Sequence, residues 1–140
     1  MPVEMKVQLR QISASASEAE MGRHRVLVDR PIEKGGTDQG PMGGQLFLAS
    51  VAGCFISNVL AAIRARESNV SGVQVEVIGT LADDAPARFV KLELLVSAES
   101  GDQESLEKLI EIADRGCIMM NTLRSTLEIQ IRARAAVQVE

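Results

Sequence analysis

Aromatic side chains are nearly absent from this sequence of 140 residues, which has three Phe and neither Tyr nor Trp. A core must therefore be built from aliphatic residues and methionine. With a net charge of −4 and no basic run, the scarcity of stacking rings argues against a nucleic-acid-binding protein. Hydrophobic residues make up 46% and charged residues 24%, which is ordinary for a globular protein. We expect a single domain over residues 1–140.

Residues that bind metals or phosphates are also scarce. A closed zinc site takes four ligands, whereas the chain offers two Cys and one His, so we expect no metal and no resident cofactor. The glycine-rich segment 35–44 lacks the lysine and the spacing of a P-loop, and it predicts only a flexible connection. His24 lies in the alternating segment RHRVLVD, which favours a residue on the surface of a strand over a base for a catalytic cysteine.

Two features bear on the compartment. The N-terminal segment alternates and carries charge, unlike a signal peptide, and with only two cysteines we expect a reducing cytoplasm. The segment Leu46–Ile63 has no charged residue and approaches the length of a membrane span. It contains polar residues such as Asn58 and has no aromatic belt. We interpret it as the buried central helix of a soluble protein and expect no membrane partner.

Hydrophobic periodicity predicts an α+β fold in the order ββαββαβ, with mostly antiparallel pairing. Strands are expected at 4–12 and 23–31, joined by a turn at 13–22, and the long helix at 43–67. A hairpin follows at 72–82 and 88–99. The next helix is capped by Ser100 or Asp102 and ends with Gly116 as its C′ residue. One or two helical turns within 117–125 and a strand at 126–139 complete the chain.

Cys54 and Cys117 are the residues with reactive potential. Cys54 shares a slightly polar stripe of its helix with Ser57 and Asn58. A buried, inert thiol is as consistent with this position as a reactive one, because free cysteine is among the most buried residue types. A reactive thiol needs a pKa below the usual roughly 8.5. Cys54 lies too far from its helix N-terminus for that and needs a nearby arginine, whereas Cys117 precedes a short predicted helix. The residues alone therefore rank Cys117 slightly ahead.

Three segments in order resemble the OsmC/Ohr family of osmotically inducible and organic hydroperoxide resistance proteins: GPMGGQLFLASVAGCFISNVL, RFVKLEL and GCIMMNTLR. The resemblance covers about the whole chain. Its most specific parts are the Gly-Pro loop, Ala-Gly-Cys in the central helix, and Cys-x₃-Asn-x₂-Arg, met by Cys117, Asn121 and Arg124. It implies an intertwined homodimer with antiparallel sheets flanking long central helices.

The resemblance also implies a function. Enzymes of the family reduce organic hydroperoxides through two cysteines, in defence against oxidative stress. By position Cys54 would be the peroxidatic thiol and Cys117 the resolving one, which reverses the ranking given above. Arg23 or Arg25, from the N-terminal hairpin, would stabilise the thiolate. The disulfide would be reduced by an external dithiol, without a cofactor.

One departure from the family pattern puts this activity in question. Gly44 stands ten residues before Cys54, where the peroxidases have a glutamate that holds the arginine. Without this carboxylate the arginine is expected to be less well placed, unless another acid such as Asp38 or Glu33 replaces the glutamate. The alternative is a protein of the same fold that has lost the peroxidase activity and binds a small apolar ligand or a protein partner. An apolar substrate pocket, if present, would be lined by Phe55, Phe89, Met119 and Met120.

Overall fold

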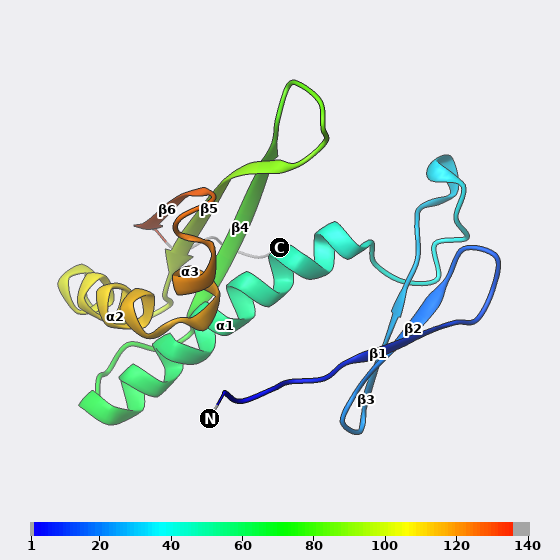
Figure 1. Ribbon diagram of the computed structural model, residues 1–140. Helices are drawn as coiled ribbons and strands as arrows, with labels where there is room; N and C mark the ends of the chain where they lie inside the picture. Colours follow the sequence, from blue (N-terminus) through cyan, green and yellow to red (C-terminus); the bar gives the residue numbers. More distant parts are fainter. Residues whose placement is uncertain (1, 136–140) are drawn as a thin grey trace. The chain divides into compact units, whose positions relative to one another are not determined.

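The computed structural model describes residues 2–135, which form two compact units, one up to residue 47 and one from residue 48 on (Figure 1). The α+β class is as predicted, and the element order is βββαββααβ, with one more strand than expected. The additional helix in this order, α3, lies where one or two helical turns are predicted. The single domain expected over residues 1–140 stays a prediction. The elements are β1 (Gln8–Gln11), β2 (Ser17–Met21), β3 (His24–Val28), the 3₁₀ helix η1 (Ile32–Lys34), α1 (Gly43–Arg66), β4 (Gln74–Leu81), β5 (Phe89–Ser97), α2 (Gln103–Gly116), α3 (Ile118–Leu123) and β6 (Glu128–Ala133).

The first unit contains an antiparallel sheet in the order β1-β2-β3. The middle strand, β2, lies in the segment that the sequence predicts as a turn, so that prediction is wrong. Alanine and glutamate have low strand propensity, but propensity yields to cross-strand pairing. Here Ala19 is buried, and Glu18 forms ion pairs with Arg10 of β1 at 2.8 Å and with Arg25 of β3 at 3.2 Å.

Asp29, directly after β3, organises the loop that leads to α1. Its buried carboxylate accepts hydrogen bonds from the Thr37 hydroxyl at 2.7 Å and from the backbone N–H groups of Arg30, Thr37 and Gln39 at 2.7, 3.2 and 3.1 Å. These bonds, that of the Thr37 hydroxyl first, hold the pKa of Asp29 well below its usual value of 3.8. The loop predicted as merely flexible is tied around one carboxylate.

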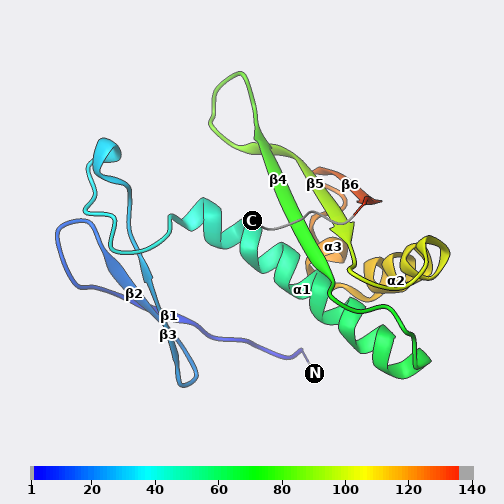
Figure 2. The same cartoon turned by 180° about the vertical axis from the view of Figure 1, so that it is seen from behind.

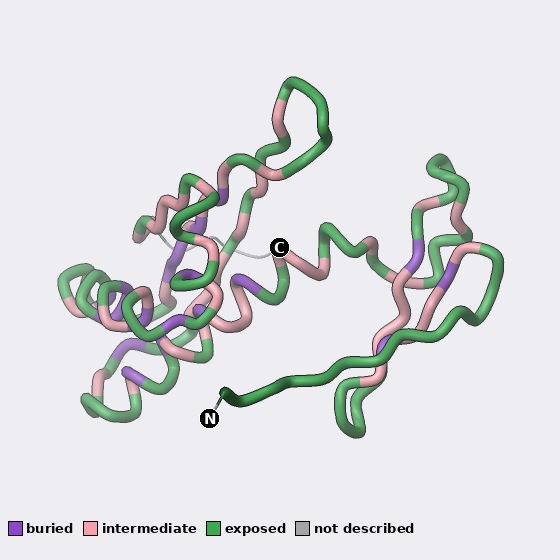
Figure 3. Tube along the Cα trace, in the orientation of Figure 1, coloured by how far each residue is buried: buried purple, intermediate pink, exposed green. Residues whose placement is uncertain are grey.

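α1 is long and apolar enough to cross a membrane, a test that the core helix of a soluble protein also passes. Its buried residues recur at helical spacing along one face (Figure 3). Others along the helix are half-buried or exposed, Leu60 to 50%. The described chain therefore buries one face of α1, whereas the sequence predicts a helix buried all round. The buried residues are Val51, Phe55, Val59 and Ala62.

The second unit is built on the sheet β4-β5-β6, with its helices packed against one face (Figures 1 and 2). The β4–β5 hairpin is antiparallel, as predicted, but β6 pairs parallel to β5. Parallel neighbours need a crossover connection, which α2 and α3 provide. Along β5, Leu92, Leu94 and Val96 are buried, and the alternate positions Lys91 and Glu93 form ion pairs on the opposite face.

Gly79 of β4 makes room for α1 on the sheet. A Cβ built at Gly79 would lie 2.9 Å from Leu48 Cδ2 of α1 and 2.7 Å from Cε1 of the Phe89 ring. Both distances are too short for real carbon atoms. The Leu48 and Phe89 side chains therefore occupy the space that a side chain at residue 79 would fill.

α2 begins at Asp102, one of the two predicted caps, whose carboxylate accepts a hydrogen bond from the Ser105 N–H at 3.4 Å. The predicted end of the helix is wrong. Gly116 is its last helical residue rather than a left-handed C′ glycine, and Cys117 both ends α2 and caps α3. The four apolar positions predicted to face the core are buried: Leu106, Leu109, Ile110 and Ala113.

Candidate functional site

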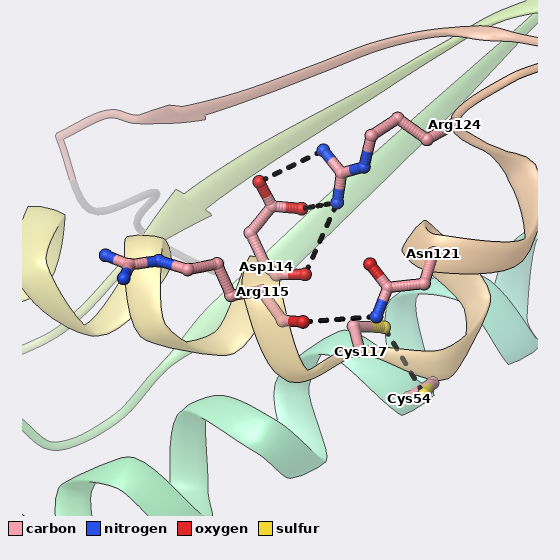
Figure 4. A network of polar contacts seen from close by, with 6 residues as sticks. All are labelled: Cys54, Asp114, Arg115, Cys117, Asn121 and Arg124. Atoms are coloured by element: carbon pink, nitrogen blue, oxygen red, sulfur yellow. Dashed lines mark hydrogen bonds and ion pairs between the residues drawn. The ribbon is translucent and has the colours of Figure 1, made fainter.

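Cys54 of α1 and Cys117 between α2 and α3 meet in the second unit (Figure 4). Their Sγ atoms lie 3.3 Å apart although the residues are 63 positions apart in the chain, and both are free thiols. The Cys117 thiol donates a hydrogen bond to the Cys54 sulfur. A disulfide bond is about 2.05 Å long, so the sulfurs need to approach by little more than about 1 Å to form one.

Cys117 is wholly buried, with 0% of its surface exposed. Burial raises the pKa of the Cys117 thiol, and the neighbouring Cys54 raises it further. The backbone N–H groups of Met120 and Met119, at the beginning of α3, lower it, but burial prevails. The acidified Cys117 suggested by the residues alone is therefore wrong, because sequence position did not reveal how deeply this thiol is packed.

Asn121 and Arg124 tie the segment that carries Cys117 to the end of α2 (Figure 4). Asn121 Nδ2 donates to the Arg115 carbonyl at 3.1 Å, which gives a partner to a carbonyl at the helix end. The Arg124 guanidinium binds both carboxylate oxygens of Asp114, Nη2 to Oδ1 at 2.8 Å and Nη1 to Oδ2 at 3.4 Å. This hydrogen-bonded pairing with Asp114 raises the pKa of Arg124. The motif Cys-x₃-Asn-x₂-Arg thus works as a clamp that holds Cys117 in place.

Cys54 is half-buried, and Asn58 follows it one helical turn later. Asn58 Nδ2 donates to the Cys54 carbonyl at 2.9 Å and lies 4.0 Å from Cys54 Sγ. On the α2 side, a Cβ built at Gly116 would lie 3.4 Å from Asn58 Oδ1. Asn58 therefore stands where α1 and the end of α2 approach each other. The helical stripe in the sequence includes Asn58 but assigns it no role.

The two arginines expected to serve Cys54 belong to the first unit. Arg25, on β3, pairs with Glu18 at 3.2 Å and with Glu20 at 3.5 Å, both on β2. Arg23 lies in the exposed turn between β2 and β3. Two glutamates thus hold Arg25. This pairing is not evident from the sequence while residues 17–21 are interpreted as a turn. The signal was present, since Glu20 faces Arg25 directly once the strand is recognised.

The family glutamate has no counterpart at the beginning of α1. Its first turn, which contains Gly44, has no acidic residue. The two acids suggested as replacements lie earlier in the first unit, Glu33 in η1 and Asp38 in a left-handed backbone conformation with φ of 55°. Both are exposed.

The expected pocket residues fall into two groups. Phe55 and Met120 are completely buried and form part of the core, whereas Met119 and Phe89 are half-buried. His24 is exposed on β3, the position expected from its alternating segment. Within residues 2–135, no three residues among His, Cys, Asp and Glu are grouped closely enough to hold a metal ion.

Comparisons with known proteins place this geometry among relatives. A model of the OsmC-like protein family matches residues 36–132. The fold is similar to that of an OsmC-like protein from Mycoplasma pneumoniae, with a TM-score of 0.83 and 15% identity over 98% of this chain and 100% of that one. For an organic hydroperoxide resistance protein, OsmC, from Legionella pneumophila, the TM-score is 0.73, with 19% identity over 96% and 98% of the two chains. For the organic hydroperoxide resistance protein OhrB of Bacillus subtilis it is 0.72, with 20% identity over 94% and 98%. No curated protein matches the chain significantly.

Proposed function

The chain belongs to the OsmC-like protein family, and from this premise we propose that it is a thiol peroxidase that reduces organic hydroperoxides in defence against oxidative stress. The observation that carries the proposal is the separation of 3.3 Å between the sulfurs of the only two cysteines in the chain. The relatives named for organic hydroperoxide resistance support the substrate class. We expect a cytoplasmic protein that uses an external dithiol and no cofactor.

Cys54 is the attacking thiol in this proposal, because it is half-buried whereas Cys117 has no exposed surface. The Cys54 thiolate attacks the terminal, hydrogen-bearing oxygen of the hydroperoxide, an S–O bond forms and the O–O bond breaks. The alkoxide leaves and takes up a proton to give the alcohol. Two electrons have passed from sulfur to oxygen, and Cys54 is left as a sulfenic acid.

Cys117 resolves this intermediate. Its sulfur attacks the Cys54 sulfur, an S–S bond forms, and the departing hydroxide takes up the thiol proton and leaves as water. The high pKa that burial gives Cys117 suits a thiol that stays protonated until its proton is needed. The dithiol reductant then attacks the disulfide and restores both thiols by exchange.

We also propose a homodimer, supported by apolar surface that a single chain leaves uncovered. Five large apolar side chains of the N-terminal segment are exposed, the first four at alternate positions, and Leu60 of α1 and Ile118 of α3 are 50% and 64% exposed. Surfaces of this kind mark protein–protein interfaces. The exposed N-terminal residues are Val3, Met5, Val7, Leu9 and Ile12.

The role of Arg23 or Arg25 as the cation that stabilises the thiolate stays a proposal.

A test adds one equivalent of cumene hydroperoxide per protomer and maps thiols and disulfides by mass spectrometry without reduction. We expect an intramolecular Cys54–Cys117 disulfide and one equivalent of alcohol. Cys54→Ser should consume no peroxide, whereas Cys117→Ser should react once and stop. The proposal is wrong if both thiols survive in the parent protein, or if Cys54→Ser consumes peroxide as fast as the parent.

A second candidate function is a protein of this family without peroxidase activity that binds a small apolar ligand or a partner. Gly44, in a first helical turn without a carboxylate, favours it. This candidate predicts that both thiols survive the peroxide pulse and that an apolar fluorescent probe binds the folded protein. Loss of both thiols within the pulse excludes it.

A further inference from the structure

Asn58 lies beside the attacking sulfur, and the reaction proposed above gives it no task. We propose that Asn58 is a positioning residue for Cys54. The side-chain amide of Asn58 orients the Cys54 sulfur and donates a hydrogen bond to it when Cys54 is a thiolate. The inference rests on the proposed function, because it concerns the same thiol. Asn58 lies within a segment that resembles the OsmC/Ohr family, but the resemblance assigns it no role.

The hydrogen-bond partners of Asn58 fix the orientation of its amide. The Cys54 carbonyl can only accept, so the group that lies 2.9 Å from it must be the NH₂ group of Asn58. One proton of that group is used in this bond and the second is left over. The same nitrogen lies 4.0 Å from Cys54 Sγ, so the second proton has the sulfur within reach. The amide oxygen lies toward Gly116 instead.

The distance of 4.0 Å is at the outer limit for a hydrogen bond to sulfur, and the bond to a neutral thiol is correspondingly weak. A thiolate is a stronger acceptor, and hydrogen bonds to charged groups are shorter and stronger than those between neutral groups. The contact therefore strengthens when Cys54 loses its proton. Such a difference between the two states is what favours the thiolate.

The second donor to Cys54 acts in the same sense. The Cys117 thiol donates to the Cys54 sulfur at 3.3 Å, so Cys54 faces donors both from its own helix and from the α2–α3 junction. The beginning of α1 has no carboxylate that would hold an arginine. A neutral amide on the same helix turn stabilises the thiolate without depending on any other segment.

The test measures the pH profile of Cys54 alkylation by iodoacetamide in a Cys117→Ser background, which leaves one thiol and keeps a hydroxyl donor beside it. Asn58→Leu removes the amide at similar size, and we expect the midpoint of the profile to rise by about one pH unit. Asn58→Asp places a carboxylate at the same point, and the midpoint should rise further. Ser57→Asp, on the adjacent exposed position, is the matched control for charge and should move the midpoint by less than half as much.

The inference is overturned if Asn58→Leu lowers the melting temperature and keeps the parent midpoint, because Asn58 is then only a structural residue. Should Asn58→Leu not fold, Asn58→Asp decides, and a midpoint no higher than that of Ser57→Asp overturns the inference. Alkylation involves no peroxide, so this result stands apart from the proposed function. A protein that alkylates as expected but spares its thiols from hydroperoxide would refute the peroxidase proposal alone.

Discussion

Oxidation of Cys54 and Cys117 to a disulfide should stabilise the fold by an amount that follows from the chain. The bond would close a loop between residues 63 positions apart. Loop-closure entropy for this length is about 14 cal/mol/K, or about 4 kcal/mol at 25 °C. The sulfurs already lie 3.3 Å apart, so little strain is expected to offset this gain. We predict that the oxidised protein is more stable than the reduced one by about 2–4 kcal/mol.

Urea unfolding of the oxidised and the reduced protein measures this difference. Both forms must be compared at one protomer concentration, because the stability of the homodimer proposed above would depend on that concentration. Cys117→Ser, treated with the same oxidant, is the control and should show no gain. Equal stability, or a less stable oxidised form, would show that the disulfide cannot form without distorting the structure, which contradicts the expectation of little strain.

Three further predictions concern the supporting structure. Gly116→Ala should raise the free energy of unfolding by up to about 1 kcal/mol, since residue 116 is helical and the new Cβ stays 3.4 Å from Asn58 Oδ1. A thermal melt that shows destabilisation would instead indicate that residue 116 is a left-handed C′ glycine. Gly40→Ala should destabilise by about 2 kcal/mol or more in urea, because its Cβ would lie 2.3 Å from the Leu27 carbonyl oxygen, and an unchanged midpoint would contradict this. The Asp29 carboxylate has a lowered pKa, so its stabilising effect is complete above its usual value of 3.8 and is lost as the pH falls below it. The stability difference between the parent and Asp29→Asn should therefore narrow in acid, and a constant difference down to pH 2 would show that the carboxylate has no such role.

Periodicity predicted those elements whose burial pattern is set along their own length. Burial alternates along the middle of both β4 and β5, and α2 carries its apolar residues at helical spacing. The strand β2 was not predicted, because its residues prefer helices and turns. It is stabilised by ion pairs of Glu18 with arginines of the neighbouring strands. The parallel pairing of β6 depends on the crossover through α2 and α3, which no local pattern records.

For the site, the residues alone singled out both cysteines and the resemblance implied their roles, but the residues alone did not show that the two sulfurs meet. Burial of Cys117 reversed the local inference that a helix N-terminus acidifies it. The ion pair between Arg124 and Asp114 joins α3 to α2. Asn58 contacts Cys54 within α1 and also lies beside the end of α2. The Arg124–Asp114 pair and the approach of α2 to Asn58 arise from tertiary packing, so the spacing of residues in the sequence could not predict them. The contact of Asn58 with Cys54 is an i, i+4 pair within α1, and the helical stripe in the sequence already placed these two residues on one face.

The sulfenic acid on Cys54 is the intermediate on which the whole account depends. Cys117→Ser cannot resolve it, so one equivalent of cumene hydroperoxide followed by dimedone should leave an adduct on Cys54 that mass spectrometry detects. We expect this adduct in nearly every protomer within the time of the pulse. An unmodified Cys54 thiol, with the peroxide still present, would contradict it.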